Sequence, residues 1–72
     1  MKPTQVVAEV AGKVWKVEAS PGAQLAADDV VLILESMKME IPVVAPVAGK
    51  LLELRVKEGD MVNEGDVVAV IG

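Results

Sequence analysis

The 72-residue sequence contains no cysteine, histidine, phenylalanine or tyrosine, and only one tryptophan. Without cysteine no disulfide can stabilise the fold, and without cysteine or histidine we expect no structural zinc site. The thiol nucleophile and the commonest general base are missing too, so a catalytic site would have to be built from carboxylates, lysines and hydroxyls. We therefore expect a binding or carrier module that has no catalytic site of its own.

Positive charge and long apolar runs are also scarce. Seven basic residues against eleven acidic ones give a net charge of −4, whereas nucleic-acid-binding proteins present basic surfaces with aromatic side chains for stacking. No window approaches the roughly 18 consecutive apolar residues of a membrane span, and the N-terminal residues do not resemble a secretory signal. We expect no nucleic-acid partner, no membrane partner, and a cytoplasmic or equivalent reducing compartment.

Valine is abundant in the sequence, and β-branched side chains favour strands. The length allows one small domain, residues 1–72. Alternating apolar and polar residues, with turn signals roughly every 8 to 12 residues, predict short strands throughout and no helix. The expected strands span residues 5–10, 13–19, 24–25, 30–35, 39–44, 50–56, 61–62 and 67–71.

The sequence repeats itself with an offset of 37 residues. Residues 8–35 align without a gap on residues 45–72, and nine of the 28 pairs are identical. Two copies of one strand-turn-strand unit around a pseudo-twofold axis predict an all-β flattened barrel or sandwich of two four-stranded antiparallel sheets. In such a barrel, the hairpin at residues 35–40 that joins the copies should lie at the opposite end from the two chain termini.

Several turn residues indicate an unusual backbone conformation. Asp28 aligns with Gly65, and aspartate tolerates the left-handed region better than most residues, so we expect the same turn in both copies. A positive φ is expected at four glycines because only glycine adopts it without strain. These are Gly22, Gly49, Gly59 and Gly65.

Two further side chains carry expectations about the fold. Trp15 shares the parity of Val17 and Ala19 in an alternating segment and is expected in the core. The alternation repeats in the second copy, where Leu52 shares a face with Leu54 and Val56. Pro42 lies inside a predicted strand, where it can donate no ladder hydrogen bond. That strand is therefore expected to be an edge strand or to be bulged.

The copies are joined by the hexapeptide Glu35-Ser36-Met37-Lys38-Met39-Glu40. It lies between two β-prone segments, which predicts a tight hairpin with Lys38 at or beside the tip. Two methionines flank the lysine at a water-facing position where Asn, Gly or Asp are the usual turn residues. Methionine is flexible and polarizable and suits a surface that another protein recognises. The hexapeptide thus predicts a lysine presented to an enzyme.

This hexapeptide resembles the attachment motif of the biotinyl/lipoyl attachment family, biotinyl branch. The duplicated half-barrel and the Glu-Gly-Asp sequences at 58–60 and 64–66 are similar to that family's fold over nearly the whole chain. No insertion interrupts residues 19–30, so the chain looks like the thumbless carriers and the free-standing biotin/lipoyl attachment proteins. The resemblance implies that Lys38 receives biotin through an amide bond.

The resemblance also implies partners. A biotin protein ligase would acylate Lys38, a biotin carboxylase would load a carboxyl group onto the biotin, and a carboxyltransferase would pass it on. The carrier itself is expected to be monomeric. Met37 and Met39 are expected to be recognised by the ligase, although Met39 has the parity of core residues. Glu35 and Glu40 are expected either to be recognised by the ligase or to be solvated charges at the strand ends.

Two alternatives stay open at this point. Lipoyl carrier domains of 2-oxo acid dehydrogenase complexes share the fold and typically have Asp-Lys-Ala at the tip, where this chain has Met37 and Met39 around the lysine. The same half-barrel repeat also occurs as an unmodified structural domain in adaptor proteins, which would have long helical hairpins at the seam and no modified lysine. The sequence does not indicate which acceptor takes the carboxyl group.

Overall fold

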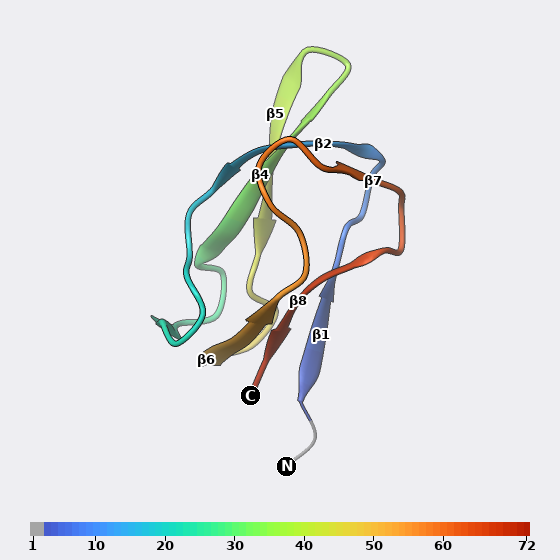
Figure 1. The fold of residues 1–72 in the computed structure, drawn as a ribbon. Helices are drawn as coiled ribbons and strands as arrows, with labels where there is room; N and C mark the ends of the chain where they lie inside the picture. The colour runs from blue at the N-terminus through green and yellow to red at the C-terminus, as the bar shows by residue number, and fades with distance from the viewer. Residues whose placement is uncertain (1–2) are drawn as a thin grey trace.

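The computed structural model, which describes residues 3–72, contains two antiparallel sheets of four strands each (Figure 1). The strand orders are β1-β8-β6-β3 and β5-β4-β2-β7. The described residues include no helix that could cross a lipid bilayer. The predicted all-β barrel-sandwich is confirmed. The strands are β1 (Thr4–Val7), β2 (Gly12–Val17), β3 (Gln24–Leu25), β4 (Val30–Ser36), β5 (Met39–Val44), β6 (Gly49–Leu54), β7 (Met61–Val62) and β8 (Val67–Ile71).

The internal repeat is visible in the topology. An offset of 37 residues maps β1, β2, β3 and β4 onto β5, β6, β7 and β8, and so converts one sheet order into the other. Equivalent backbone hydrogen bonds join the halves in both directions. Gly22 N donates to Leu51 O at 2.7 Å, and the equivalent Gly59 N donates to Val14 O at 2.8 Å. Each half therefore holds a turn of the other half around a pseudo-twofold axis.

The core between the sheets is entirely aliphatic, because no buried polar or charged side chain occurs in residues 3–72. Val31 and Val68 are equivalent in the repeat. The β4–β5 ladder leaves Val31 without a partner, and the β1–β8 ladder leaves Val68 without one. Both are therefore β-bulge residues, and both are fully buried. In a small chain without disulfides this core has to supply the stability. Its largest fully buried side chains are Leu32, Leu34, Leu51, Ile71, Val14, Val31 and Val68.

Trp15 does not lie in the core, so that prediction is wrong: the residue is 48% exposed. Val14 pairs with Leu34 and Lys16 pairs with Ile33, which makes Trp15 the extra residue of a β-bulge. The bulge inverts the alternation of side chains, so Val14 is buried in place of Trp15. The second copy has the same bulge at Leu52, which is 50% exposed and likewise not in the core.

The glycine predictions hold with one exception. Gly22, Gly59 and Gly65 have positive φ angles of 93°, 96° and 89°, and Asp28 has φ 74°, as its alignment with Gly65 predicts. Gly49 has no positive φ, so the prediction for it is wrong. It is needed for close packing instead, because a Cβ there would lie 2.7 Å from Ile71 Cγ2.

Strand ends and edges follow from backbone hydrogen bonds. Pro42 lies in β5, which is an edge strand of its sheet, as predicted. By contrast, β1, β2 and β6 each end two or three residues earlier than predicted. In β2 this happens because Glu18 N and Ala19 N both donate to Val31 O, at 2.9 and 3.1 Å, so the regular ladder cannot continue.

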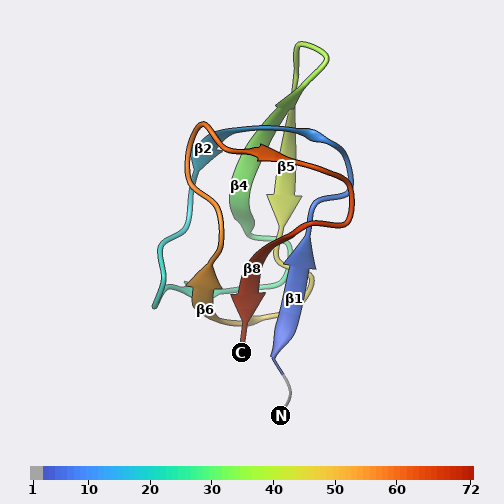
Figure 2. The ribbon, with the colours of Figure 1, turned by 45° about the vertical axis from the view of Figure 1, so that its right-hand side comes forward.

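The β4–β5 hairpin projects from one end of an elongated molecule that measures 36 × 19 × 18 Å (Figure 1). Figure 2 shows that Gly72 and the start of β1 lie at the other end, so the predicted opposition of hairpin and chain ends is confirmed for residues 3–72. The pseudo-twofold axis requires this arrangement, because it relates the β4–β5 junction to the gap between the end of β8 and the start of β1.

Candidate functional site

The tip of the β4–β5 hairpin is a two-residue turn. Ser36 pairs with Met39 in the ladder, which leaves Met37 and Lys38 as the connection. Their φ angles are 51° and 66°, and positive values at both central residues are the mark of a type I′ turn. This turn normally takes Asn-Gly, since other residues pay roughly 1–2 kcal/mol each for the left-handed region. Strand pairing therefore holds the tip in a conformation that its side chains disfavour.

All three residues around the tip face water. Met37 is 93% exposed, Met39 is 64% exposed, and Lys38 is exposed between them. The alternative that Met39 is partly core is therefore wrong. Met39 has the parity of Ile41 and Val43, but the hairpin projects beyond the opposite sheet, so no strand covers it (Figure 2).

Two carboxylates face each other at the base of the tip. Glu35 and Glu40 are directly paired in the β4–β5 ladder, and both are exposed. Like charges directly opposite each other destabilise a strand pair. Within residues 3–72 neither side chain takes part in a salt bridge. Lys13 lies opposite Glu35 in the β2–β4 ladder but forms no ion pair with it. The hairpin thus carries an acidic pair immediately below Lys38.

Gly12 positions the hairpin, and sequence reasoning did not assign it to the site. A Cβ on Gly12 would lie 2.7 Å from the carbonyl oxygen of Glu35 and 3.4 Å from Ser36 Cβ. The small residue lets β2 pass directly against the end of β4. The available signal in the sequence is the identity of Gly12 and Gly49 in the two copies, which marks a close approach of backbone in each.

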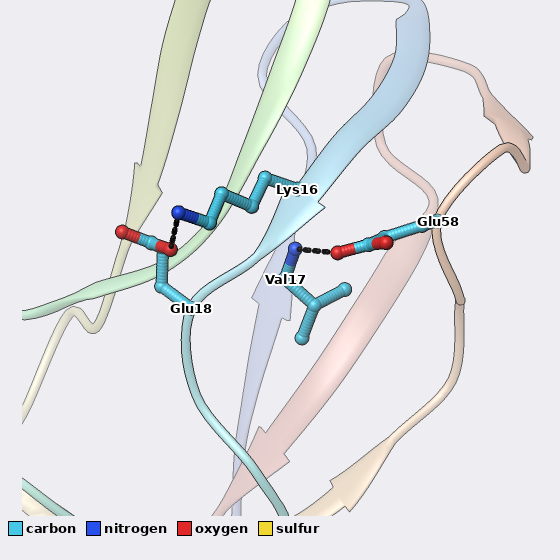
Figure 3. Close-up of polar contacts among 4 residues, drawn as sticks. All are labelled: Lys16, Val17, Glu18 and Glu58. Atoms are coloured by element: carbon cyan, nitrogen blue, oxygen red, sulfur yellow. Dashed lines mark hydrogen bonds and ion pairs between the residues drawn. The ribbon is translucent and has the colours of Figure 1, made fainter.

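A link from the second half fixes β2, the strand that supports β4. Glu58 Oε2 accepts a hydrogen bond from Val17 N at 3.1 Å (Figure 3). The residue equivalent to Glu58 in the first half is Pro21, which has no side-chain acceptor. This hydrogen bond therefore exists only on the side of the barrel that bears the hairpin.

The exposed position of Lys38 leaves its amine accessible to a modifying enzyme. Residues 3–72 contain no cluster of three or more His, Cys, Asp or Glu residues that could hold a metal ion. One pocket of about 90 Å³ lies between β1 and β5, lined by Val7, Val10, Ile41, Pro42 and neighbouring residues. Ligand sites usually measure about 300–1,000 Å³, so this pocket is too small to hold an organic cofactor. An exposed amine can instead form an amide with the carboxyl group of a cofactor without any rearrangement of the fold.

Comparison with known proteins places the site in context. The sequence matches the family described as "Biotin-requiring enzyme" over residues 2–71. It is 53% identical over 60 residues to the biotin/lipoyl attachment protein of Bacillus subtilis, covering 83% of this chain and 82% of that protein. It is 48% identical over 66 residues to the biotinylated protein TB7.3 homolog of Mycobacterium leprae, covering 92% and 93%.

A solved structure has the same fold. The urea carboxylase of Kluyveromyces lactis contains a segment that superposes with a TM-score of 0.95 and 40% sequence identity. The match covers all of this chain and 6% of that protein.

Proposed function

The chain belongs to the biotin-requiring enzyme family, and from this premise we propose that it is a biotin carboxyl carrier in which Lys38 bears the biotin. The family and its biotinylated relatives support biotin as the cofactor. The observation that supports Lys38 is its place at the tip of a projecting two-residue turn, exposed between two exposed methionines. We propose residues 1–72 as a single carrier domain with no catalytic site of its own.

Attachment requires an external enzyme. A biotin protein ligase would present an activated biotin carboxylate, the Lys38 amine would attack its carbonyl carbon, and an amide bond would form as the activating group leaves. Loss of the ammonium charge changes the net charge from −4 to −5. Met37, Met39, Glu35 and Glu40 flank Lys38 in the hairpin, and the ligase would recognise them.

The carrier role follows from tethering. Biotin supplies the ring nitrogen that accepts a carboxyl group, and the chain holds this ring on one long arm above a rigid hairpin. A biotin carboxylase and a carboxyltransferase would then each meet the ring as an intramolecular reactant at high effective concentration. Because the hairpin lies at the opposite end from Gly72, the arm points away from the chain ends (Figure 1).

Neither alternative gains support from the fold. A structural adaptor would have a helical hairpin at the seam, whereas Met37 and Lys38 alone connect β4 to β5. A lipoyl carrier would share the fold, but this chain has two exposed methionines around its lysine. The cytoplasmic location stays a prediction from the sequence.

The test is co-expression of the chain with a biotin protein ligase, followed by a streptavidin blot and intact mass measurement. We expect one biotinyl group on the wild type and none on Lys38→Arg. The control Lys50→Arg replaces another exposed lysine and should be labelled like the wild type. Label that persists on Lys38→Arg would refute the assignment. Co-expression with a lipoate ligase separates the second cofactor, because the two groups differ in mass and only biotin binds streptavidin.

A further inference from the structure

We propose that the outer face of the β5-β4-β2-β7 sheet is a second contact surface for the enzyme that acylates Lys38, an inference that rests on the proposed function. The apolar residues of this surface, called here the Trp15 face, are Trp15, Ile33, Pro42 and Met61. Trp15 is 48% exposed and Met61 is 75% exposed. Both are large apolar side chains, and such residues are enriched where proteins contact one another.

The ladder register places the Trp15 face directly below the tip. Met61 pairs with Lys13, Lys13 with Glu35, and Glu35 with Glu40, so these four form one row across all four strands. Side chains that are paired in this way lie on the same face. All four are exposed, so the row lies on the outer face, on the same strands that end in the Lys38 turn.

The next row lies one step further from the tip. Lys16 pairs with Ile33 and Ile33 pairs with Pro42, with Trp15 beside them as the bulge residue. The two rows form a continuous surface between Lys38 and the middle of the barrel. An enzyme that approaches the tip from this side contacts the acidic pair first and Trp15 next.

The duplicated half is an internal control for what the fold requires. The residues equivalent to Trp15, Ile33, Pro42 and Met61 lie on the outer face of the other sheet, where the same ladders and the same bulge occur. That sheet folds with a leucine, a valine and two glutamines. The barrel therefore does not require tryptophan, proline or methionine at these positions. The equivalents are Leu52, Val70, Gln5 and Gln24.

Charge distinguishes the two faces as well. Beside Trp15, Lys16 forms an ion pair with Glu18 at 3.3 Å (Figure 3). The equivalent pair beside Leu52 is Glu53 with Arg55 at 3.1 Å, with the two charges exchanged. Trp15 therefore lies between two lysines, Lys13 and Lys16, and the matching surface of a partner would be an apolar pocket flanked by carboxylates.

The size of an interface and the reach of the arm point to the acylating enzyme. A specific interface buries about 800 Å² on each partner, which is about one sixth of the 4610 Å² surface of the described chain. A two-residue tip cannot supply this area, so the enzyme has to cover adjoining surface. The unmodified lysine side chain is short, so the active site that acylates it must come to the tip itself. Biotin lengthens the arm, and later partners can act further from the barrel.

The test is the steady-state rate of Lys38 biotinylation by a purified biotin protein ligase, with the carrier concentration varied. We expect Trp15→Ala to raise KM about tenfold while kcat stays within about twofold, because the lost contact is remote from the reacting atoms. Trp15→Leu introduces the residue found at this place in the second copy, and its KM should lie between those of the wild type and Trp15→Ala. The matched control Leu52→Ala truncates the equivalent bulge residue on the other face and should leave kcat/KM within about twofold of the wild type.

A binding measurement tests the same surface without chemistry. In the Lys38→Arg variant, Trp15 is the only tryptophan, so labelling with 5-fluorotryptophan yields a single ¹⁹F resonance. We expect this resonance to shift when the ligase is added. A resonance that does not move overturns the proposal, and so does an equal loss of kcat/KM in Trp15→Ala and Leu52→Ala. If the wild type takes up no biotin, the proposed function is refuted. If Trp15→Ala is labelled at the wild-type rate, only the second contact surface is refuted.

Discussion

Asp28 and Gly65 occupy the same place in the two halves of the barrel and adopt the same backbone conformation. Their φ angles are 74° and 89°. Asp28 N donates to Ala45 O and Gly65 N donates to Ala8 O, both at 2.8 Å. Because the surrounding backbone is equivalent, this pair isolates the free-energy cost of a side chain in the left-handed region.

Exchanging the residues at this turn should change the stability in opposite directions. Asp28→Gly should raise the free energy of unfolding by about 0.5–1 kcal/mol, because relief of strain exceeds the added entropy of the unfolded chain. Gly65→Ala should lower it by about 1 kcal/mol, since the added Cβ meets no atom within 4 Å and only backbone strain changes. Urea denaturation measures both. A less stable Asp28→Gly variant would show that the Asp28 carboxylate makes a compensating interaction.

Adding a methyl group at Gly12 should be more costly than adding one at the equivalent Gly49. The new Cβ of Gly12→Ala would lie 2.7 Å from the backbone oxygen of Glu35, so β4 has to shift, at a cost of about 1–3 kcal/mol. In Gly49→Ala the closest atom is Ile71 Cγ2 at 2.7 Å, which belongs to a side chain and not to the backbone, so we expect a smaller backbone shift and none in the hairpin. Urea denaturation gives the stabilities, and the rate of biotinylation reports any displacement of the hairpin. Equal losses would contradict the positioning role of Gly12.

The strained tip should show a conflict between stability and acylation. Met37→Asn should raise the free energy of unfolding by about 0.5–1 kcal/mol, because asparagine suits the first central position of a type I′ turn. The same change should lower kcat/KM for biotinylation, since the exposed methionine is lost. The control Met39→Asn lies in β5 without a positive φ and should reduce stability, as asparagine is a poor strand residue. Faster acylation of Met37→Asn would contradict recognition of this methionine.

The acidic pair below the tip should cost stability. Glu40→Lys places a cation opposite Glu35 and should raise the free energy of unfolding by about 0.2–1 kcal/mol. The gain should shrink as salt is added, because both side chains are exposed. Glu40→Gln removes the repulsion without adding an attraction, so it should raise the free energy of unfolding by less than Glu40→Lys does. We expect biotinylation of Glu40→Lys to be slower, and an unchanged rate would assign Glu40 as a solvated charge at the strand end.

Local patterns and the repeat predicted most of the architecture. Eight strands, the edge position of Pro42 and the turn at Asp28 follow from turn chemistry and from the alignment of the two copies. The exposed position of Lys38 in a tight hairpin follows from the hexapeptide and its two β-prone flanks, while its modification stays a proposal. These features are encoded by neighbouring residues or by the duplication, and both can be read without coordinates.

The β-bulges could not be read from alternation alone. A pattern of period two assigns Trp15 to the core, and one extra residue moves it to the surface. A signal does exist in the repeat: Val14-Trp15 aligns with Leu51-Leu52, so both copies have two adjacent apolar residues where strict alternation allows one. The prediction for Gly49 is wrong because this glycine makes a close contact with Ile71 and needs no positive φ, and its only signal in the sequence is its identity with Gly12 in the repeat.

The pseudo-twofold axis has a consequence for the architecture of the arm. Thr4 pairs with Ile71 as Ile41 pairs with Leu34, so the ladder at the end of the barrel with the termini has the same geometry as the base of the hairpin. A circular permutant that joined Gly72 to Pro3 through Ser-Met-Lys-Met and opened at Lys38 would carry its lysine at the opposite pole. The backbone of the barrel thus offers two equivalent positions for a projecting hairpin, and the order of the chain places Lys38 at one of them.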